Sequence, residues 1–230
     1  MDQKFSGVKH LGIIMDGNRR WAKERKLLPM MGHRAGADVL KKTAVWCQEF
    51  NIKYLTVFCF SSENWQRPSR EVDYLMDLMI QFFSQGKNWV NEENIKIKIS
   101  GSRERFSPKI RKMMEKFEQE TSDNFGLILN LAISYSGRDE IVYALQQIVH
   151  RFKNEEINED LISKNLWTAD LPDPDLIIRT GGEKRLSGFL IWQAAYTELY
   201  FSSKYWPDFT KRDLKTALID YHQRQRRFGL

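Results

Sequence analysis

The sequence predicts a single α/β domain, spanning residues 1–230, in which a mainly parallel sheet is covered by helices. Short apolar runs alternate with longer amphipathic segments along the chain, and this alternation is typical of repeated βαβ units. Hydrophobic residues make up 42% of the chain, which is enough to form a sizeable core. No internal repeat and no linker rich in Gly, Pro or Ser interrupts the sequence, so one large domain is favoured over two small ones.

The predicted strands are apolar runs that suit burial on both faces of a sheet, and they occupy residues 10–15, 54–60, 127–133 and 175–178. Residues 95–100 alternate Ile with Lys, which predicts a strand near a sheet edge. A further apolar stretch runs from 189 to 201. Helical spacing of apolar residues predicts helices from residue 20, from about 37, over 69–85, over 108–121, after 139 and after 210, with at most one short helix within 154–170. Ser69 and Thr210 are the predicted N-caps of two of them.

Polar residues follow the predicted strands at the point where each strand ends. Asp16 follows the first strand, and residues 61–67, Arg138 and residues 179–187 follow three others. The carboxyl ends of parallel strands share one edge, and ligands bind there in open α/β sheets. We therefore expect these residues to converge on one rim of the sheet.

This rim combines one acid with several arginines, which suits a diphosphate held together with a metal ion. Asp16 repels phosphate directly but can hold Mg²⁺ that a phosphate also holds. Arg179 and Arg185 offer paired N–H donors, and free N–H groups at the start of the following helix attract phosphate. The alternative interpretation of Asp16 is an ordinary Asp-Gly turn between strand and helix.

Two further residues allow two interpretations each. His33 follows a Gly near the start of a predicted helix, so it is either a packing or capping histidine or part of the site near Asp16. Trp65 lies between Asn64 and Arg67, so it is either a core residue or the aromatic wall of a site that stabilises a carbocation.

The net charge of +6 and a pI near 9.2 indicate an anionic partner, which is a nucleic acid, a membrane surface or a phosphorylated small molecule. The sequence lacks the usual phosphate loops of ATP and NAD proteins and the spacings of structural zinc sites. No signal peptide or transmembrane helix is expected, and Cys47 and Cys59 are interpreted as buried thiols in a reducing compartment. A cytoplasmic protein, with at most peripheral contact with a membrane, is therefore expected. The basic cluster of Arg224, Arg226 and Arg227 is typical of a solvated helix end.

Nearly the whole chain resembles the cis-prenyltransferases, and most closely the bacterial undecaprenyl diphosphate synthases. The resemblance is carried by the patterns IIMDGNxRWAK, FSxENWxRP and IRTGGExRLSxFLxWQxxYxELYF, found at residues 13–23, 60–68 and 178–201. It extends to residues 32–36, 130–141, 206–209 and 226–229. The implied fold is a central, mostly parallel, six-stranded sheet surrounded by helices, working as a homodimer.

The resemblance also implies roles for individual residues. Asp16 is implied to bind Mg²⁺ and promote departure of the allylic diphosphate, Asn64 to act in proton removal, and Glu198 to be a second Mg²⁺ ligand that serves the other subunit. The residues implied to hold the allylic diphosphate are Gly17, Asn18, Arg19, Arg20, Trp21 and His33. Those implied to shape the site are Ser61, Ser62, Glu63, Trp65 and Arg67. Those implied to bind isopentenyl diphosphate are Arg179, Arg185, Leu186 and Ser187.

The sequence departs from the family pattern at three positions. Pro29 stands where an Arg is usual, so one diphosphate donor is missing or supplied elsewhere. Lys184 stands where some members carry a His near the metal, and Cys59 stands where Ala is frequent. A larger side chain at residue 59 would shorten the product if that position lines the tunnel for the growing chain.

The expected activity is condensation of isopentenyl diphosphate with farnesyl diphosphate in successive cis additions. The expected product is undecaprenyl diphosphate, the lipid carrier of bacterial cell-wall glycans, which would then enter the membrane. The alternatives are a synthase of another product length, a non-catalytic subunit of a prenyltransferase complex, and, from the pI alone, a nucleic-acid-binding protein. The intact Asp16, Asn64 and Arg179 argue against the non-catalytic subunit, and a nucleic-acid partner is not expected.

Overall fold

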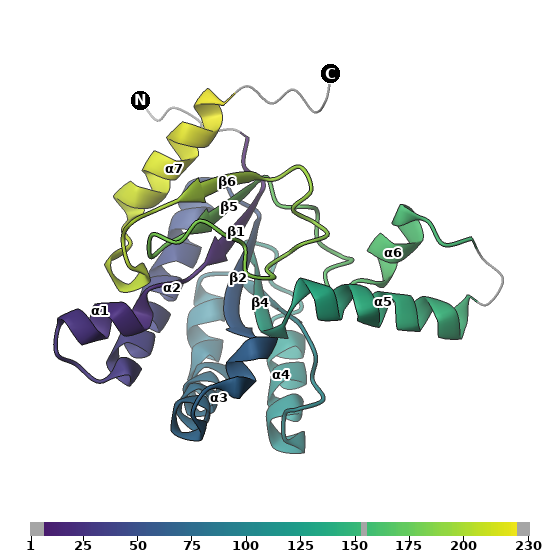
Figure 1. The fold of residues 1–230 in the computed structure, drawn as a ribbon, viewed down its shortest axis with the longest axis horizontal. Coiled ribbons are helices and arrows are strands. Elements are labelled where there is room, and N and C mark those ends of the chain that lie inside the picture. The colour runs from purple at the N-terminus through teal and green to yellow at the C-terminus, as the bar shows by residue number, and fades with distance from the viewer. Residues whose placement is uncertain (1–6, 153–155, 225–230) are drawn as a thin grey trace.

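A computed structural model describes residues 7–152 and 156–224 and confirms the predicted α/β class (Figure 1). Six strands form one sheet in the order β3-β4-β2-β1-β5-β6, and every neighbouring pair is parallel. The strands are β1 His10–Ile14, β2 Tyr54–Ser61, β3 Lys96–Ser100, β4 Ile128–Tyr135, β5 Leu176–Arg179 and β6 Glu198–Phe201. As predicted from its alternating sequence, β3 is an edge strand.

The α-helices of the described residues are α1 Asn18–Glu24, α2 Pro29–Glu49, α3 Ser69–Glu92, α4 Pro108–Glu120, α5 Gly137–Arg151, α6 Glu159–Asn165 and α7 Lys211–Gln223. The described residues also form two short 3₁₀ helices, η1 Ser62–Gln66 and η2 Trp206–Asp208. The prediction of Thr210 as an N-cap is confirmed, because its side chain accepts a hydrogen bond from the Asp213 N–H. The prediction for Ser69 is wrong: Pro68 holds the N-cap position and Ser69 is the first helical residue.

Two helices near the predicted site begin earlier than their apolar spacing predicts. α1 begins at Asn18, directly after the Asp-Gly turn, and α2 begins at Pro29. Proline suits the first helical position because its fixed φ is already helical and its missing N–H would have no partner there. The segment 32–36 therefore lies within the first turns of α2 and does not lead into it.

The sheet carries different layers on its two faces. Alternate residues of the strands form a large core with the inner faces of α2, α3, α4 and α7. On the other face, Phe189 and Leu190 of an irregular segment pack against Ile14, Ile177 and Tyr135. Figure 1 shows α5 and α6 projecting to the right of the other helices. No helix of the described residues combines the length and the apolar character needed to cross a membrane.

A row of neutral polar side chains crosses four strands inside the core. His10 of β1 contacts Thr56 of β2 (Nε2 to Oγ1, 2.8 Å), and the Asn130 amide of β4 donates to the same Oγ1 (3.3 Å). The Ser100 hydroxyl of β3 donates to Asn130 Oδ1 (2.9 Å), and His10 Nδ1 lies 2.5 Å from the Pro172 carbonyl oxygen. We call these four side chains the polar row. Because a one-residue shift of any strand would leave buried polar atoms unpaired, the polar row favours this strand register.

The connections reverse direction at the junction of β1 and β5. β1 is followed in the chain by its neighbour β2 on one side, whereas β5 is followed by β6 on the other. Ile14 pairs with Arg179, so the chain leaves both strands at the same level of the sheet. Such a switch point creates a crevice at the carboxyl ends of the strands, where ligands bind.

Candidate active site

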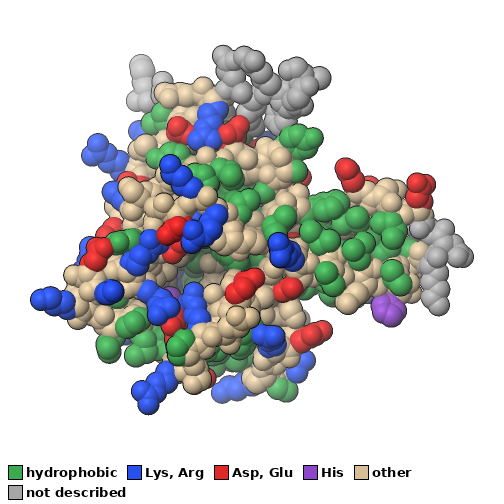
Figure 2. All heavy atoms as spheres, viewed as in Figure 1, with side chains coloured by type: hydrophobic (Ala, Val, Ile, Leu, Met, Phe, Trp, Pro, Cys, Tyr) green, Lys and Arg blue, Asp and Glu red, His purple; other side chains and the backbone are tan. Residues whose placement is uncertain are grey.

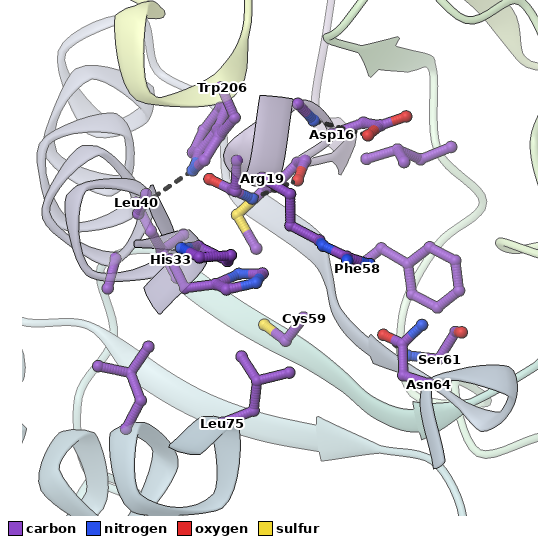
Figure 3. A pocket seen from close by; sticks show the side chains of 18 of the residues that line it. Asp16, Arg19, His33, Leu40, Phe58, Cys59, Ser61, Asn64, Leu75 and Trp206 are labelled. Carbon is purple, nitrogen blue, oxygen red and sulfur yellow. Dashed lines mark hydrogen bonds between the residues drawn. The ribbon is translucent and has the colours of Figure 1, made fainter. Parts of the chain in front are cut away.

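A cavity of about 1160 Å³ lies at this edge of the sheet. Its polar lining comes from the ends of β1, β2 and β5 and from α1, and its apolar lining includes Leu75, Met79 and Phe83 of α3. In the close view of Figure 3, Asp16, Ser61 and Asn64 lie on one side, whereas Leu40 and Leu75 lie on the other. The cavity is therefore suited to a molecule with a polar head and an apolar tail.

Asp16 is held by three hydrogen-bond donors at the end of β1. Its Oδ1 accepts from the Gly17 N–H (2.6 Å) and from Arg20 Nη2 (3.2 Å), and its Oδ2 accepts from Arg179 Nη2 (2.9 Å). The Asp16 side chain remains 29% exposed, whereas that of Arg179 is only 6% exposed. The carboxylate is thus oriented by the protein and still open to the cavity.

Arg179 also fixes the loop that follows β5. Its Nη1 donates to Ser187 Oγ (2.8 Å) and to the backbone carbonyl of Arg185. Its Nε is buried and has no hydrogen-bond partner among the described residues. A buried guanidinium with an unused donor at a cavity is the environment expected for an anion-binding site.

Two glycines make this crowded geometry possible. Gly17 has φ +103°, and a Cβ on it would lie 2.6 Å from the Tyr205 ring. Gly181 has φ +85°, and a Cβ there would lie 2.7 Å from Arg20 Nη2. Residues that carry a side chain would be strained in these backbone conformations. At residue 17 the side chain would collide with the Tyr205 ring, and at residue 181 it would displace the Arg20 guanidinium.

The start of α1 packs directly against α2. A Cβ on Gly32 would lie 2.0 Å from the Asn18 carbonyl oxygen, and one on Gly36 would lie 2.4 Å from Asn18 Oδ1. This close approach brings His33 of α2 to the cavity, near the start of α1. It also buries the side-chain oxygen of the half-buried Asn18, whose side-chain amide donates to the Met15 carbonyl (2.9 Å).

Two arginines and a histidine of the cavity lining converge on one acid that the sequence did not single out. Glu71 of α3, 11% exposed, contacts Arg67 (2.9 Å), His33 Nε2 (3.6 Å) and Arg19 (3.7 Å). Burial lowers the pKa of His33 and the charge of Arg67 lowers it further, although Glu71 opposes both effects. The sequence signal for Glu71 was its spacing of four residues from Arg67 at the start of a helix, which is typical of an ion pair.

The segment after β2 uses its polar side chains partly for its own structure. Asn64 Oδ1 accepts from the Ser61 N–H (3.2 Å), which caps η1, and the Ser62 hydroxyl donates to Asp139 (2.5 Å). The Trp65 ring packs edge-on against Phe60, and its N–H donates to Ser134 Oγ (2.9 Å). The structure therefore favours the core interpretation of Trp65.

Most of the residues implied by the resemblance line this one cavity. These are Asp16, Gly17, Asn18, Arg19, Arg20, His33, Ser61, Glu63, Asn64, Arg67, Arg179 and Ser187. Outside the lining lie Trp21, Ser62, Trp65, Arg185, Leu186, Glu198 and Arg138. Trp21 donates to Asp208 (2.7 Å), and Arg185 is exposed and pairs with Glu183 (2.5 Å).

The three departures from the family pattern occupy different places. Pro29 and Cys59 line the cavity, and burial raises the pKa of the Cys59 thiol to about 12. Lys184 is exposed. Cys47 is buried in the core as predicted. Residues 226–229, which carry the last stretch of the resemblance and include Arg226 and Arg227 of the basic cluster, lie outside the described residues.

Asp16 and Glu198 do not meet within one chain. Glu198 begins β6, three register positions before the level of Arg179, which corresponds to roughly 10 Å along the sheet. Its carboxylate accepts from Arg224 Nη1 (2.7 Å). Among the described residues, no group of three or more His, Cys, Asp or Glu side chains is arranged to hold a metal. A single carboxylate beside a diphosphate site does fit Mg²⁺, which commonly takes one protein ligand plus phosphate oxygens and water.

Comparison with known proteins agrees with this geometry. Residues 14–229 match the family described as "Putative undecaprenyl diphosphate synthase". The chain belongs to this family of isoprenyl transferases. The isoprenyl transferase of Thermotoga maritima is 47% identical over 224 residues, covering 96% of each chain. That of Bacillus anthracis is 45% identical over 226 residues, covering 96% of this chain and 88% of the relative.

Two solved structures share the fold over almost their whole length. Lavandulyl diphosphate synthase from Lavandula x intermedia, in complex with dimethylallyl diphosphate, superimposes with a TM-score of 0.92 at 34% identity, covering 97% of this chain and 98% of that one. A probable undecaprenyl diphosphate synthase from Campylobacter jejuni superimposes with a TM-score of 0.84 at 35% identity, covering 98% and 100%. The predicted membership of the family is confirmed, as is the fold.

Proposed function

We propose that this isoprenyl transferase condenses isopentenyl diphosphate with farnesyl diphosphate in successive cis additions to make undecaprenyl diphosphate. The observation that carries this proposal is a single cavity with a guanidinium-rich head next to Asp16 and an apolar remainder lined by α3. A diphosphate ester of a long hydrocarbon matches both parts. An apolar chain in this cavity is favoured by burial, at about 25 cal/mol for each Å² of surface removed from water.

The polar head can hold two diphosphates side by side. Arg19, Arg20 and His33 face the cavity from α1 and α2, and Arg179 and Ser187 face it from the β5 side. Each charged hydrogen bond to phosphate contributes roughly 1.5–3 kcal/mol net, so a few of them give micromolar affinity. Holding both substrates in one cavity makes the reaction effectively unimolecular.

In the proposed reaction the allylic C–O bond breaks and its electron pair leaves with the diphosphate. The alkene of the isopentenyl unit forms the new C–C bond, and that unit then loses a proton. Arg20 and the N–H groups at the start of α1 stabilise the negative charge that develops on the leaving group. Asn64 lines the cavity and is the residue proposed to act in proton removal, with the released diphosphate as the base that finally accepts the proton.

Asp16 is the residue that would hold Mg²⁺, with the remaining ligands coming from the allylic diphosphate and water. Bound there, the ion would neutralise charge on the departing diphosphate. Arg179 keeps the Asp16 carboxylate oriented toward the cavity throughout. The proposed role of Glu198 concerns the cavity of a second copy, since Glu198 and Asp16 are separated within one chain.

We further propose a homodimer formed through α5 and α6. Figure 2 shows apolar side chains gathered over these two helices. The exposed apolar residues there include Val142, Tyr143, Val149 and Ile157, which are 36–62% exposed. Contiguous apolar surface of this kind is typical of a subunit interface. The oligomeric state in solution, measured by light scattering, would test this part of the proposal.

For the length of the product, the sequence offers a specific alternative to the proposed eleven isoprene units. Cys59 lines the cavity where Ala is frequent in the family, and a larger side chain there favours a shorter product. The Lavandula relative was solved in complex with dimethylallyl diphosphate, a short allylic diphosphate, and this supports a synthase of another product length as the competing proposal.

The test is incubation of the protein with farnesyl diphosphate, isopentenyl diphosphate and Mg²⁺, followed by sizing of the products. A single main product of eleven isoprene units supports the proposal. A shorter or longer main product would instead support a synthase of another product length. No product, with or without added Mg²⁺, would favour the non-catalytic subunit. Cys59→Ala is the companion variant, and a longer product from it would place Cys59 at the growing chain.

A further inference from the structure

A second exposed apolar surface lies at the corner between α1 and α2. Leu27 is 42% exposed, Leu28 64% and Met31 46%, and all residues from 23 to 29 are exposed. We call Leu27, Leu28 and Met31 the corner patch. In Figure 1 this corner lies at the lower left, whereas α5 and α6 project on the right, so the patch is separate from the proposed dimer surface.

Unpaired basic residues surround the corner patch. Lys23, Lys26 and Arg34 are exposed, and within the described part of the chain none of them forms an ion pair. Glu24 is the one acid among residues 23–34, and it accepts a hydrogen bond from the Tyr205 hydroxyl (2.5 Å). Asp208 also lies against α1, where it pairs with Arg25 (3.0 Å). The surface therefore combines apolar side chains with an excess of positive charge.

The patch is continuous with the cavity. Lys23, Lys26 and Leu27 belong to the cavity lining and are also exposed, so the cavity reaches the surface at this corner. The first turn of α2 carries no acidic residue, and Leu28 holds its N-cap position without a capping side chain. An exposed leucine stands where Ser, Thr, Asp or Asn would stabilise the helix.

We propose that the corner patch docks on an anionic lipid surface, with its apolar side chains inserted at the headgroup level and its lysines and arginine on the acidic headgroups. Release of the lipid product from the cavity at this corner would follow, and that part rests on the proposed function. The docking itself does not depend on it. Apolar insertion and charge attraction act together in this mode of binding. A second copy of the chain is a poorer occupant, because two such basic corners repel each other.

The experiment is co-sedimentation of the full chain with vesicles of phosphatidylcholine, with or without phosphatidylglycerol, in the absence of substrate. The test variant is Leu28→Asp/Met31→Asp. Both changes lie at the N-terminus of α2, where acids cap the helix and suit its dipole, so the variant should fold at least as well as the parent. Neither residue lines the cavity.

The expected result is binding to phosphatidylglycerol vesicles that falls by more than tenfold in this variant. Arg34→Gln should weaken it by about fivefold, the effect of one basic residue near an anionic surface. Phe125→Asp is the matched control, because Phe125 is 87% exposed and lies in the loop before β4, at the amino end of the sheet, whereas the cavity and the corner patch lie at the carboxyl end. Its binding should equal that of the parent.

Three results would overturn the proposal: no binding of the parent to anionic vesicles, equal binding by the double variant, or an equal loss with Phe125→Asp. A change of oligomeric state in the double variant, without vesicle binding by the parent, would assign the patch to a second copy. Condensation activity is assayed separately in detergent. Failure of the proposed reaction would therefore leave the sedimentation result standing.

Discussion

The polar row across the sheet and the cluster around Asp16 are both built from buried polar side chains, yet they differ in charge and in completeness. In the polar row, His10, Thr56, Asn130 and Ser100 are neutral and hydrogen-bonded to one another. Around Asp16 the side chains are charged, and Arg179 keeps a buried donor without a partner in the described part of the chain.

The difference shows how one sheet separates stability from function. A closed neutral network stabilises the fold because its hydrogen bonds are all made within the protein. An incomplete charged cluster gains its remaining partners from a ligand. Changes in the polar row should therefore alter unfolding, and changes in the cluster should alter turnover.

The largest expected effect is that of Asp16→Ala, which should lower kcat by about 10²–10⁴ through loss of metal-assisted departure of the diphosphate. Because alanine leaves the buried Arg179 without any acceptor at residue 16, Asp16→Asn is the milder variant, since it keeps the size of the side chain and one acceptor oxygen. It should lose turnover to a similar degree while losing less stability than Asp16→Ala, although Arg179 loses its opposite charge in both variants. Asp38→Ala, on the exposed face of α2, is the control for activity, and full turnover by Asp16→Asn would remove this carboxylate from the mechanism.

The next effect concerns pH and the polar row. Burial lowers the pKa of His10 to about 4, despite its contact with the Pro172 carbonyl. Between about pH 6.5 and 4 the unfolded chain binds a proton that the folded chain does not, so stability present above pH 6.5 is lost as the pH falls. The loss should approach about 3 kcal/mol at pH 4.

Denaturant unfolding at several pH values would measure it. His10→Gln should show a shallower fall over the same range, since the carboxylates that titrate there are common to both proteins. Equal slopes would mean that His10 is not the group responsible.

A smaller effect is expected at the border of the cluster. Glu71→Gln keeps the size of the side chain but removes the charge that gathers Arg19, His33 and Arg67. We expect the KM for the allylic diphosphate to rise about tenfold, the equivalent of one weakened charged hydrogen bond, with a smaller change in kcat. Steady-state kinetics would separate the two, with Asp73→Asn on the same helix as control. A fall in kcat without a rise in KM would show that Glu71 does not position these three side chains.

The smallest expected effect is that of a residue outside both the polar row and the cluster around Asp16, so it serves as a reference for the other variants. Thr210→Ala removes the N-cap of α7 and should lower the free energy of unfolding by about 1 kcal/mol. Turnover of the purified variant should not change. A loss of turnover would mean that stability and activity are not separable in this chain.

The sequence was sufficient to predict those features that depend on local pattern. The apolar runs ending at Met15, Phe60 and Ile178 predicted parallel strands, and because such strands end at one edge, Asp16 and Arg179 were expected to lie together. Both lie within hydrogen-bonding distance in the fold. Family motifs added Asn18, His33 and Ser187, which also line the cavity.

Features that depend on packing between distant segments could not be predicted in this way. Glu71 serves the cavity only because α3 packs beside α1 and α2, and no single stretch of sequence shows that approach. Trp65 matched a motif, yet its ring turns into the core. The role proposed for Glu198 could not be examined within one chain, because the resemblance implies that this residue serves the site of a second copy.

Arg179 gives the loop between residues 180 and 187 a rigidity that does not depend on ligand. One side chain joins Asp16 to the backbone of Arg185 and to Ser187, so the loop is ordered during folding. A preorganised loop loses little conformational entropy when substrate arrives, which leaves more of the contact energy for affinity. Arg179→Lys would preserve the positive charge but not the forked geometry. The loop would then have to become ordered each time a substrate binds, at a cost in conformational entropy.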